Sequence, residues 1–378
     1  MQIAVHYAGI ELKHPIMAAA AGITATVDRM RRAEDAGVSA ICVKSLFENP
    51  IPRRGDPTPH MHVIRHGRGQ RAVTLYSYEQ AAHLDEFAYA DLIRQAKHSL
   101  AIPVIANIDC ATPEAWASYA RLVEQAGADA VEVKSCPHGE HMMSGDELAA
   151  TVAHVKSLVQ IPVIAKMPSQ LTNPYRSALD LASVGADALV MFNRHSGLDI
   201  DVVSCRPIMH GGFAGHGGPY SIYYRLRWIA QVADQLTIAI CGTGGIASGE
   251  DVAKYLLAGA TCVQLATAAI TEGYGAFTRI IREFTQWMER GGHADVASVR
   301  GLAARRLLGI GEVERRQSVR AEIDTLACTE CGLCERVCIY DAAHSTGSGS
   351  FAVGPTCVGC GLCVDLCPVA AIRLVGLA

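Results

Sequence analysis

The five residues IPVIA occur twice in this chain, at positions 102–106 and again at 161–165. The tetrapeptide GADA also occurs twice, at 127–130 and at 185–188. In both cases the second copy follows 58 to 59 residues after the first, which is about the length of two successive strand-plus-helix units. The repeat therefore predicts a parallel sheet whose strands are joined by helices.

Apolar runs of strand length, rich in β-branched residues, alternate along the chain with amphipathic stretches of helix length. Several runs follow an Ala-Gly pair, as expected where a helix ends and turns into the next strand. Eight such runs favour a closed α/β structure, the (β/α)8 or TIM barrel, over the alternative of an open doubly wound sheet. In such a barrel the reactive groups lie after the carboxyl ends of the strands. The runs are residues 16–21, 38–45, 103–108, 128–135, 162–167, 186–192, 237–242 and 261–266.

The composition is that of a folded α/β protein, with 378 residues, 50% hydrophobic residues, 19% charged residues and a formal net charge of −4. The absence of a basic field gives no support to nucleic-acid binding through phosphate neutralisation. No apolar run has the length of a membrane span, and the first residues lack the basic and apolar regions of an export signal. We therefore expect a cytoplasmic protein with neither a nucleic-acid nor a membrane partner.

Cysteine is concentrated in the tail, where eight of the 14 cysteines occupy the last 51 residues. They form two copies of the spacing C-x2-C-x2-C-x3-C, which is typical of paired [4Fe-4S] clusters. Zinc is the alternative, but zinc sites usually show C-x2-C pairs that lie far apart. In this spacing the fourth cysteine of each motif ligates the other cluster. The expected ligand sets are Cys328, Cys331, Cys334 and Cys367 for one cluster, and Cys357, Cys360, Cys363 and Cys338 for the other.

The tail closely resembles the bacterial two-cluster ferredoxins, which implies a small α+β ferredoxin-like domain at residues 326–378. One position departs from that family, because Ile339 stands where a proline usually follows the first motif. This change affects the local turn and leaves the ligand count intact. Residues 291–325 are charged and helical in pattern, and they predict a helical connector. The barrel is then expected at residues 1–290.

Two segments with the composition of phosphate-binding loops end the last two expected strands, GTGGI at 242–246 and QLATA at 264–268. Barrels bind phosphate at these two places, through backbone N–H groups that need no positive side chain. The first segment also matches a dinucleotide-binding fingerprint. However, the acidic residue about 20 positions further on is missing, and the segment follows the seventh strand and not the first. We therefore expect a phosphate site.

Around these loops, over most of residues 10–290, the chain resembles the flavin-dependent dihydroorotate and dihydropyrimidine dehydrogenases. The resemblance is closest to the barrel-plus-ferredoxin part of the dihydropyrimidine dehydrogenases. The motifs that carry it are VKS at 43–45, SCPHG at 135–139 and AKM at 165–167, together with the phosphate loops. It implies that FMN binds in the barrel. The cofactor-binding residues that it implies are Ala19, Ala20, Gly22, Lys44, Ser45, Asn107, Lys166, Asn193, Gly217, Gly218, Gly244, Gly245, Ala266 and Thr267.

Cys136 is the expected proton donor, because the cysteine of this loop is the acid/base opposite the flavin in the family that the chain resembles. A thiol with a pKa of about 8.5 is mostly protonated at pH 7, so it donates a proton while the flavin delivers hydride. His138 is expected to organise the loop or to take part in proton transfer. Lys44 and Lys166 are expected to stabilise the reduced flavin, unless they are surface lysines. An inert buried thiol is the alternative for Cys136 and the expectation for Cys42, Cys241 and Cys262.

Two positions depart from the family and predict a substrate other than a standard pyrimidine. The asparagine that grips the pyrimidine three residues before the cysteine is Val133 here, so this amide clamp is missing. The residue after the asparagine of strand six is Arg194, followed by His195 and Ser196, where the family has a small hydroxyl residue. The loop at 51–71 contains five arginines and three histidines against one aspartate. This charge suits an anionic substrate or a docking surface for an acidic partner, and a solvated face is the remaining alternative.

These features predict an FMN- and iron–sulphur-dependent oxidoreductase that reduces, or in reverse forms, an activated C=C bond beside a carbonyl, on a substrate other than a standard pyrimidine. An anionic substrate is the expectation if the loop at 51–71 covers the mouth of the barrel. A true dihydropyrimidine or dihydroorotate dehydrogenase subunit is one alternative, and an electron-transfer subunit of a larger redox complex is another. No second nucleotide-binding domain is visible in the sequence. The redox partner is therefore expected to be a separate FAD/NAD(P)H flavoprotein subunit or a ferredoxin, and we expect a homo- or hetero-oligomer.

Overall fold

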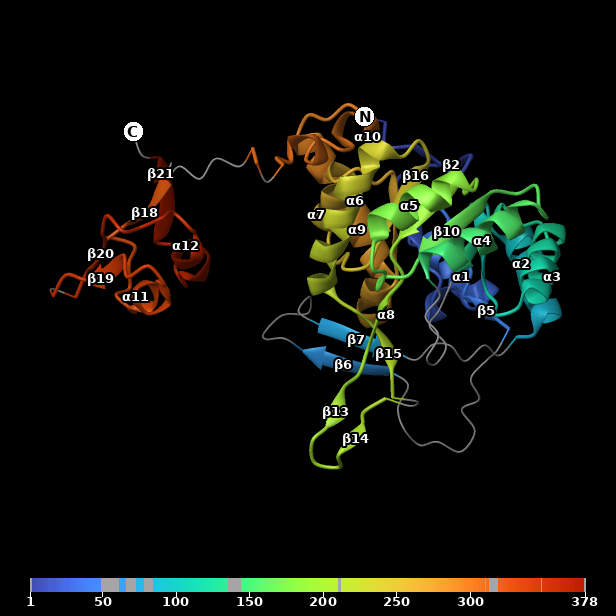
Figure 1. Ribbon diagram of the computed structural model, residues 1–378, viewed down its shortest axis with the longest axis horizontal. Helices are drawn as coiled ribbons and strands as arrows, with labels where there is room; N and C mark the ends of the chain where they lie inside the picture. Colours follow the sequence, from blue (N-terminus) through green and yellow to red (C-terminus); the bar gives the residue numbers. More distant parts are fainter. Residues whose placement is uncertain are drawn as a thin grey trace. The chain divides into compact units, whose positions relative to one another are not determined.

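The protein is represented by a computed structural model (Figure 1), in which contacts divide the chain into two units, Met1–Leu307 and Leu308–Ala378. None of the described helices is long and apolar enough to cross a membrane. The structure describes residues 2–48, 61–65, 73–77, 84–134, 144–209, 212–309, 311–312, 319–347 and 349–376.

A closed ring of eight parallel strands forms the centre of the first unit. In chain order the strands are β3 (Ile16–Ala18), β4 (Ile41–Cys42), β8 (Val104–Asp109), β9 (Ala130–Lys134), β10 (Val163–Met167), β11 (Ala188–Met191), β16 (Ala239–Thr243) and β17 (Cys262–Leu265). Each strand pairs with the next in this order, and β17 pairs with β3 to close the ring. Every expected apolar run contains one of these strands, so the predicted (β/α)8 barrel is confirmed.

Helices follow the barrel strands and surround them (Figure 1). Side-chain caps start several of them; for example, Thr112 accepts a hydrogen bond from the Ala115 N–H at the start of α3. Gly37 and Gly127 follow the ends of two helices with positive φ angles of 101° and 91°, as the Ala-Gly pairs predict. The helices are α1 (Val27–Asp35), α2 (Glu86–Ser99), α3 (Pro113–Gln125), α4 (Gly145–Lys156), α5 (Pro174–Ser183), α6 (Ile222–Val232), α7 (Gly249–Leu257), α8 (Thr267–Glu272) and α9 (Gly275–Arg290).

The barrel strands are buried on both faces, which explains why they read as continuous apolar runs and not as alternating ones. The polar residues in these strands are the informative exceptions, because a buried polar group needs a partner or a function. They are Asn107, Asp109, Glu132, Lys134, Lys166 and Gln264.

Several short antiparallel elements were not predicted. The hairpin of β1 (Val5–Tyr7) and β2 (Ile10–Leu12) precedes the barrel. A four-stranded antiparallel sheet, ordered β12-β15-β7-β6, is built from insertions after two barrel strands, so it lies on the carboxyl-terminal side of the barrel. Its strands are β6 (Met61–Arg65), β7 (Val73–Ser77), β12 (His195–Gly197) and β15 (Ala214–Gly217), and the remaining short strands of this unit are β5 (Leu46–Phe47), β13 (Ile200–Asp201) and β14 (Arg206–Pro207).

The second unit contains two antiparallel strand pairs and two short helices. Strand β18 (Val319–Ile323) pairs with β21 (Ile372–Gly376), and β19 (Ala343–Ser345) pairs with β20 (Phe351–Val353). The helices are α11 (Leu333–Val337) and α12 (Leu362–Leu366).

The expected helical connector at 291–325 differs from the structure. Its first part packs on the barrel, where the N–H of Gly301 donates to the Leu256 carbonyl at 2.8 Å and that of Ala303 donates to the Leu257 carbonyl at 3.0 Å. Its last part forms β18 of the second unit. In the described part of this stretch, α10 (Val296–Val299) and a single 3-10 turn are the helical elements. The charged pattern thus marked two packed segments and not one continuous helix.

Candidate active site

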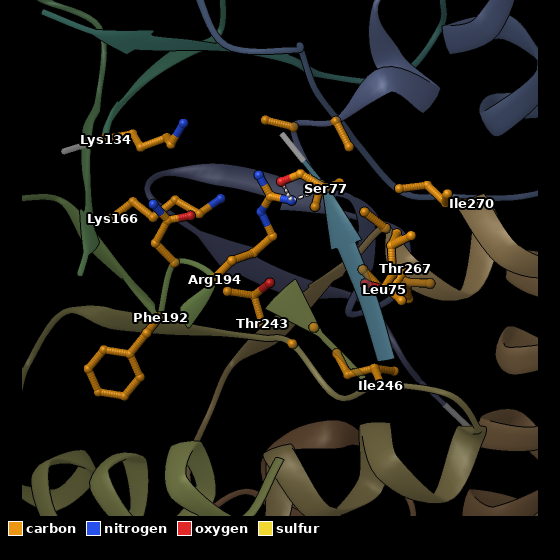
Figure 2. A pocket seen from close by; sticks show the side chains of 18 of the residues that line it. Leu75, Ser77, Lys134, Lys166, Phe192, Arg194, Thr243, Ile246, Thr267 and Ile270 are labelled. Carbon is orange, nitrogen blue, oxygen red and sulfur yellow. Dashed lines mark hydrogen bonds between the residues drawn. The ribbon is translucent and has the colours of Figure 1, made fainter. Parts of the chain in front are cut away.

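A pocket lies at the carboxyl ends of the barrel strands (Figure 2). This is where (β/α)8 barrels carry their active sites. Most of the residues expected to bind the cofactor line it. They are Ala19, Ala20, Lys44, Ser45, Lys166, Asn193, Gly217, Gly244, Gly245, Ala266 and Thr267, together with Arg194 from the expected substrate residues.

Five basic side chains also line this pocket, and among its described lining residues there is no aspartate or glutamate. The excess of positive charge suits ligands with anionic groups. The basic residues are Lys44, Lys134, Lys166, Arg194 and Arg225.

A buried tyrosine, Tyr255, fixes the backbone of the loop after β16. The Tyr255 hydroxyl donates to the Gly244 carbonyl at 2.6 Å and is 3.1 Å from the Thr243 carbonyl. Gly244 and Gly245 adopt positive φ angles of 93° and 76°, which favour glycine. A Cβ atom at Gly242 would lie 2.1 Å from the Tyr255 ring, so glycine is required there by close packing. Tyr255 thus fixes two carbonyl groups of the loop that the sequence predicts to bind phosphate.

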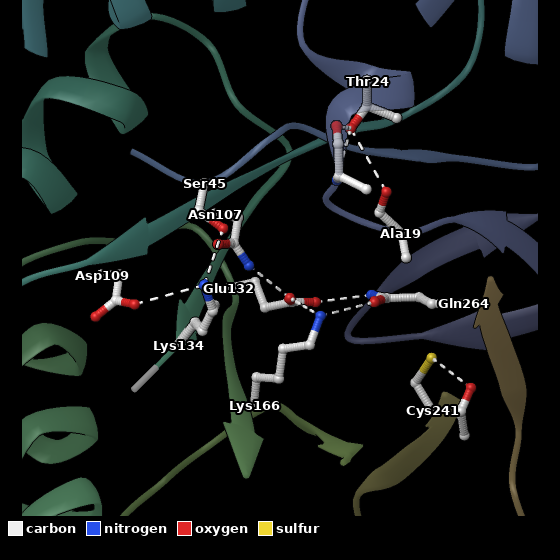
Figure 3. A network of polar contacts seen from close by, with 12 residues as sticks. Ala19, Thr24, Ser45, Asn107, Asp109, Glu132, Lys134, Lys166, Cys241 and Gln264 are labelled. Carbon is white, nitrogen blue, oxygen red and sulfur yellow. Dashed lines mark hydrogen bonds and ion pairs between the residues drawn. The ribbon is translucent and has the colours of Figure 1, made fainter. Parts of the chain in front are cut away.

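A buried polar network lies beneath the pocket (Figure 3). One carboxylate oxygen of Glu132 accepts from Asn107 Nδ2 at 2.6 Å and from Lys166 Nζ at 2.8 Å, and the other accepts from Gln264 Nε2 at 2.7 Å. Burial alone lowers the pKa of Lys166, but the Glu132 carboxylate offsets this and leaves that pKa above its usual value. Lys166 is therefore a fixed positive charge in the pocket wall. The Oδ1 atom of Asn107 is buried without a hydrogen-bond partner in the described structure.

Lys134 ends β9 and points into the same pocket (Figures 2 and 3). Its ammonium group lies 3.5 Å from the Asp109 carboxylate, 3.4 Å from Ser45 Oγ and 4.4 Å from the centre of the Phe47 ring. These contacts come from three other points on the chain and orient a side chain that is otherwise flexible. Lys134 was not among the expected site residues.

Arg194 also lines the pocket and is anchored to the antiparallel sheet (Figure 2). Its guanidinium group donates to the hydroxyl and the carbonyl oxygen of Ser77 on β7. It also lies against Gly215 on β15, where a Cβ atom would be 2.7 Å from the guanidinium carbon. The antiparallel sheet, which was not predicted, therefore positions Arg194, which was predicted as a site residue.

Arg225 is buried in the wall between α6 and the pocket. Its side chain donates to the carbonyls of Ser221 and Asn193 at 2.7 and 3.2 Å, and to His195 Nε2 at 3.2 Å. Burial, with a further contribution from Arg225, lowers the pKa of His195 to about 4. His195 is thus neutral at pH 7 and carries its proton on Nδ1, because arginine only donates. This contact was not predicted.

Six expected residues do not line the pocket. Gly22 begins a 3-10 turn after β3, Gly218 packs against β7, and Asn107 lies in the network below. Val133 is fully buried; its neighbours Glu132 and Lys134 supply the polar contacts of β9, and neighbouring residues on a strand face opposite sides. His195 and Ser196 lie in β12, behind the pocket wall.

Three other expectations fall wholly or mainly outside the described residues. They concern Cys136, His138 and the basic loop at 51–71, of which only Met61–Arg65 is described, as strand β6. The three cysteines expected to be inert, Cys42, Cys241 and Cys262, are buried inside barrel strands. Burial raises the pKa of the Cys42 and Cys241 thiols, which keeps both protonated.

In the second unit, five of the expected cluster ligands line one cavity. Four of them form one expected set, in which the fourth ligand comes from the other motif. These four are Cys328, Cys331, Cys334 and Cys367, and the fifth, Cys363, is expected to ligate the other cluster.

The two cysteine motifs have matching local structure. In each, a glycine with positive φ precedes a five-residue helix, at Gly332 and at Gly361. In each, the first sulphur accepts a hydrogen bond from the backbone N–H two residues later, and the fourth sulphur accepts one from the N–H four residues later. Such bonds stabilise the thiolates that bind iron. The N–H to Sγ pairs are Glu330 to Cys328, Gly359 to Cys357, Ala342 to Cys338 and Ala371 to Cys367, at 3.2 to 3.4 Å.

The fold and the pocket define a (β/α)8-barrel protein with a pocket lined by basic side chains at its carboxyl-terminal end and a C-terminal cysteine-rich unit. A family model described as dihydroorotate dehydrogenase matches residues 2–288, and one described as 4Fe-4S binding domain matches residues 356–373. The chain belongs to the dihydroorotate dehydrogenase family. It is accordingly an oxidoreductase that acts on CH–CH bonds.

Three relatives are catalytic subunits of dihydroorotate dehydrogenase B (NAD(+)). The Pyrococcus abyssi protein is 31% identical over 303 residues, which cover 78% of this chain and 97% of that protein. The Pyrococcus furiosus protein is 30% identical over 309 residues, covering 80% and 99%. The Methanothermobacter thermautotrophicus protein is 30% identical over 302 residues, covering 78% and 96%. We expected the closest resemblance to the dihydropyrimidine dehydrogenases. These comparisons support the dihydroorotate dehydrogenase family and not that specific resemblance.

Proposed function

We propose that this chain is the catalytic subunit of an FMN- and iron–sulphur-dependent dehydrogenase whose substrate is dihydroorotate or a close carboxylate analogue. The family and the relatives support this alternative better than our first prediction of a substrate that is not a pyrimidine. The observation that carries it is the pair of anchored cations, Lys134 and Arg194, at the pocket. Dihydroorotate differs from an uncharged dihydropyrimidine by its carboxylate, which suits such cations.

The pocket residues fit FMN. The glycine loop at 244–245 and the neighbouring Thr267 are placed for a phosphate, the small residues Ala19 and Ala20 leave room for a flat ring, and Lys166 holds a fixed positive charge. FMN, when bound, supplies hydride transfer and links it to single-electron transfer. The residues of this chain orient the ring, neutralise charge near it and exclude water from the pocket.

Cys136 is proposed to hold the proton that the substrate gains or loses. Oxidation of a CH–CH bond removes hydride from one carbon and a proton from its neighbour, so the site requires a base as well as a hydride acceptor. Replacing Cys136 with alanine should reduce substrate turnover at least about a hundredfold, the usual contribution of a positioned acid or base. Electron transfer between the clusters and an artificial acceptor should persist. If substrate turnover also persists, the chain acts as an electron-transfer subunit and this proposal is wrong.

The role of Lys134 is tested by the kinetics of Lys134→Met. We expect the KM for dihydroorotate to rise about ten- to hundredfold, because one charge-assisted hydrogen bond is lost, while kcat changes much less. Lys254→Met is the matched control, because Lys254 forms an exposed surface pair with Glu250 at 3.1 Å. An unchanged KM in Lys134→Met would show that the carboxylate binds elsewhere.

We further propose two [4Fe-4S] clusters in the second unit. The family model for the iron–sulphur domain matches the second motif, and the support for a first cluster is the matching local structure of the first. Protein purified without oxygen should contain about eight iron atoms per chain. Cys331→Ala and Cys360→Ala should each remove about half of the iron; loss from only one of the two variants would leave a single cluster.

A redox partner and a cytoplasmic location stay predictions. The relatives are catalytic subunits by name, which supports a separate flavoprotein subunit as the partner over a free ferredoxin. Anaerobic purification, with identification of the proteins that co-purify, tests this directly. A chain that oxidises dihydroorotate with NAD+ in the absence of any other protein would contradict it.

A further inference from the structure

Arg225 is a buried charge without an acidic partner. Its side chain is 1% exposed, and its hydrogen bonds in the described structure go to two backbone carbonyls and a neutral imidazole. The Nε atom is buried with no partner at all. The groups that raise the pKa of Arg225 against its burial are three tyrosines, Tyr255, Tyr220 and Tyr224, none of which is an anion at neutral pH.

The position of the guanidinium group shows where its missing partner would lie. A Cβ atom added to Gly244 would be 2.5 Å from Arg225 Nε and 2.7 Å from its guanidinium carbon. The guanidinium therefore lies directly against the glycine loop that follows β16. Arg225 also lines the pocket, together with Gly245 and Thr267. The unsatisfied side of the group thus meets the part of the pocket that is suited to phosphate.

A buried cation with no counter-charge is costly, and proteins keep such groups where a ligand supplies the opposite charge. We propose that Arg225 binds the phosphate of FMN, adding a buried positive charge to the backbone N–H groups of the loop. This inference rests on the proposed function, because it assumes that FMN occupies the pocket. It assigns a role to an arginine on the buried face of α6, which otherwise carries apolar residues.

The alternative anion is the carboxylate of the substrate. The structure favours phosphate, because Arg225 touches the glycine loop while Lys134 lies on β9, at strand four of the ring. The two flavins FMN and riboflavin separate these possibilities, since they differ only by the phosphate group. If Arg225 binds the phosphate, its replacement weakens the binding of FMN but not of riboflavin. If Arg225 binds the substrate, its replacement changes the affinity for neither flavin.

The experiment measures flavin affinity and not turnover. Full-length protein is stripped of flavin and titrated with FMN and with riboflavin, using the quenching of flavin fluorescence. We compare the wild type with Arg225→Gln and Arg225→Lys. Arg227→Gln is the matched control, since Arg227 is exposed on the same helix and stacks on Trp228 at 4.4 Å.

We expect Arg225→Gln to weaken FMN binding about ten- to hundredfold, the value of one charge-assisted contact, and to leave riboflavin binding within about threefold. Arg225→Lys should fall between, because it keeps the charge but loses the planar fork. Arg227→Gln should match the wild type for both flavins. Because Arg225 has no ionic partner among the described residues, flavin-free Arg225→Gln leaves no buried charge unpaired and should unfold at about the same urea concentration as the wild type.

The outcomes separate the two proposals. If the wild type binds FMN and Arg225→Gln binds it equally well, this inference is wrong while the proposed function stands. Equal weakening for FMN and riboflavin also overturns it, since the arginine then supports the pocket without contacting phosphate. If the wild type binds neither flavin, the proposed function itself fails. If Arg225→Gln does not fold, Arg225→Lys provides the test: a loss of affinity for FMN without a loss for riboflavin supports the inference, and an unchanged ratio of the two affinities overturns it.

Discussion

The ion pair between Glu132 and Lys166 is the most informative place to perturb the barrel interior. Both side chains are buried, with 0% and 6% exposure, and their closest atoms are 2.8 Å apart. Glu132→Gln removes the negative charge with little change in shape, and it leaves the Lys166 ammonium without a counter-charge. Lys166→Met leaves the carboxylate with the amides of Asn107 and Gln264 only.

Removing one partner of a buried ion pair costs about 3–5 kcal/mol, because the remaining charge stays desolvated. We expect each single variant to lose about that much free energy of unfolding in the flavin-free protein. The double variant Glu132→Gln/Lys166→Met should lose clearly less than the sum of the two, because no unpaired charge remains. The Lys166 ammonium should also deprotonate at lower pH in Glu132→Gln, since burial then acts on it without opposition.

The assay is urea denaturation of the flavin-free protein, followed by circular dichroism, for the four members of this double-mutant cycle. Lys254→Met again provides a surface control, with an expected cost of about 0–1 kcal/mol, since the Lys254–Glu250 pair is 41% and 71% exposed. If the losses of the two single variants simply add in the double variant, the pair is not coupled. Lys166 is then not the fixed charge that the flavin site requires.

Two further perturbations test other parts of the barrel. Burial lowers the pKa of His14 to about 4, so below about pH 6.5 the unfolded chain binds a proton that the folded chain does not. The free energy of unfolding should therefore fall by about 1.4 kcal/mol for each pH unit as the pH is lowered from 6.5 to 4. His14→Gln should remove this contribution to the pH dependence of the free energy of unfolding. Replacement of the exposed His6 should leave it unchanged. Gly242→Ala should displace the Tyr255 ring, cost about 1–3 kcal/mol and weaken FMN binding, and normal FMN affinity in that variant would show that the tyrosine does not hold the loop.

The barrel was predictable because its strands are buried on both sides, so each one is a continuous apolar run between helices. The antiparallel sheet was not, because its strands have three to five residues and pair across long distances, as β7 does with β15. Such pairings leave no periodic signal, since the strands are too short for one to develop.

The site residues divide in the same way. Those in family motifs were predicted, and most of them line the pocket. Lys134 was missed, although the sequence contained a signal for it. Side chains alternate along β9, so Lys134 lies on the same side of the strand as Glu132, and Val133 lies on the other side. Arg225 had no such signal, because an arginine on an amphipathic helix is usually solvent-exposed, and only the packing of α6 shows that this one is buried.

The relatives align over nearly their full length but cover only about four-fifths of this chain, and the cysteine-rich unit is joined to the barrel by the chain itself. A covalent join fixes the stoichiometry of the two units at one to one. Under the proposed function, electron exchange between the two units is a first-order event, whose rate is unchanged by dilution of the protein. The proposed relay would then persist at low protein concentrations, where complexes of separate subunits dissociate.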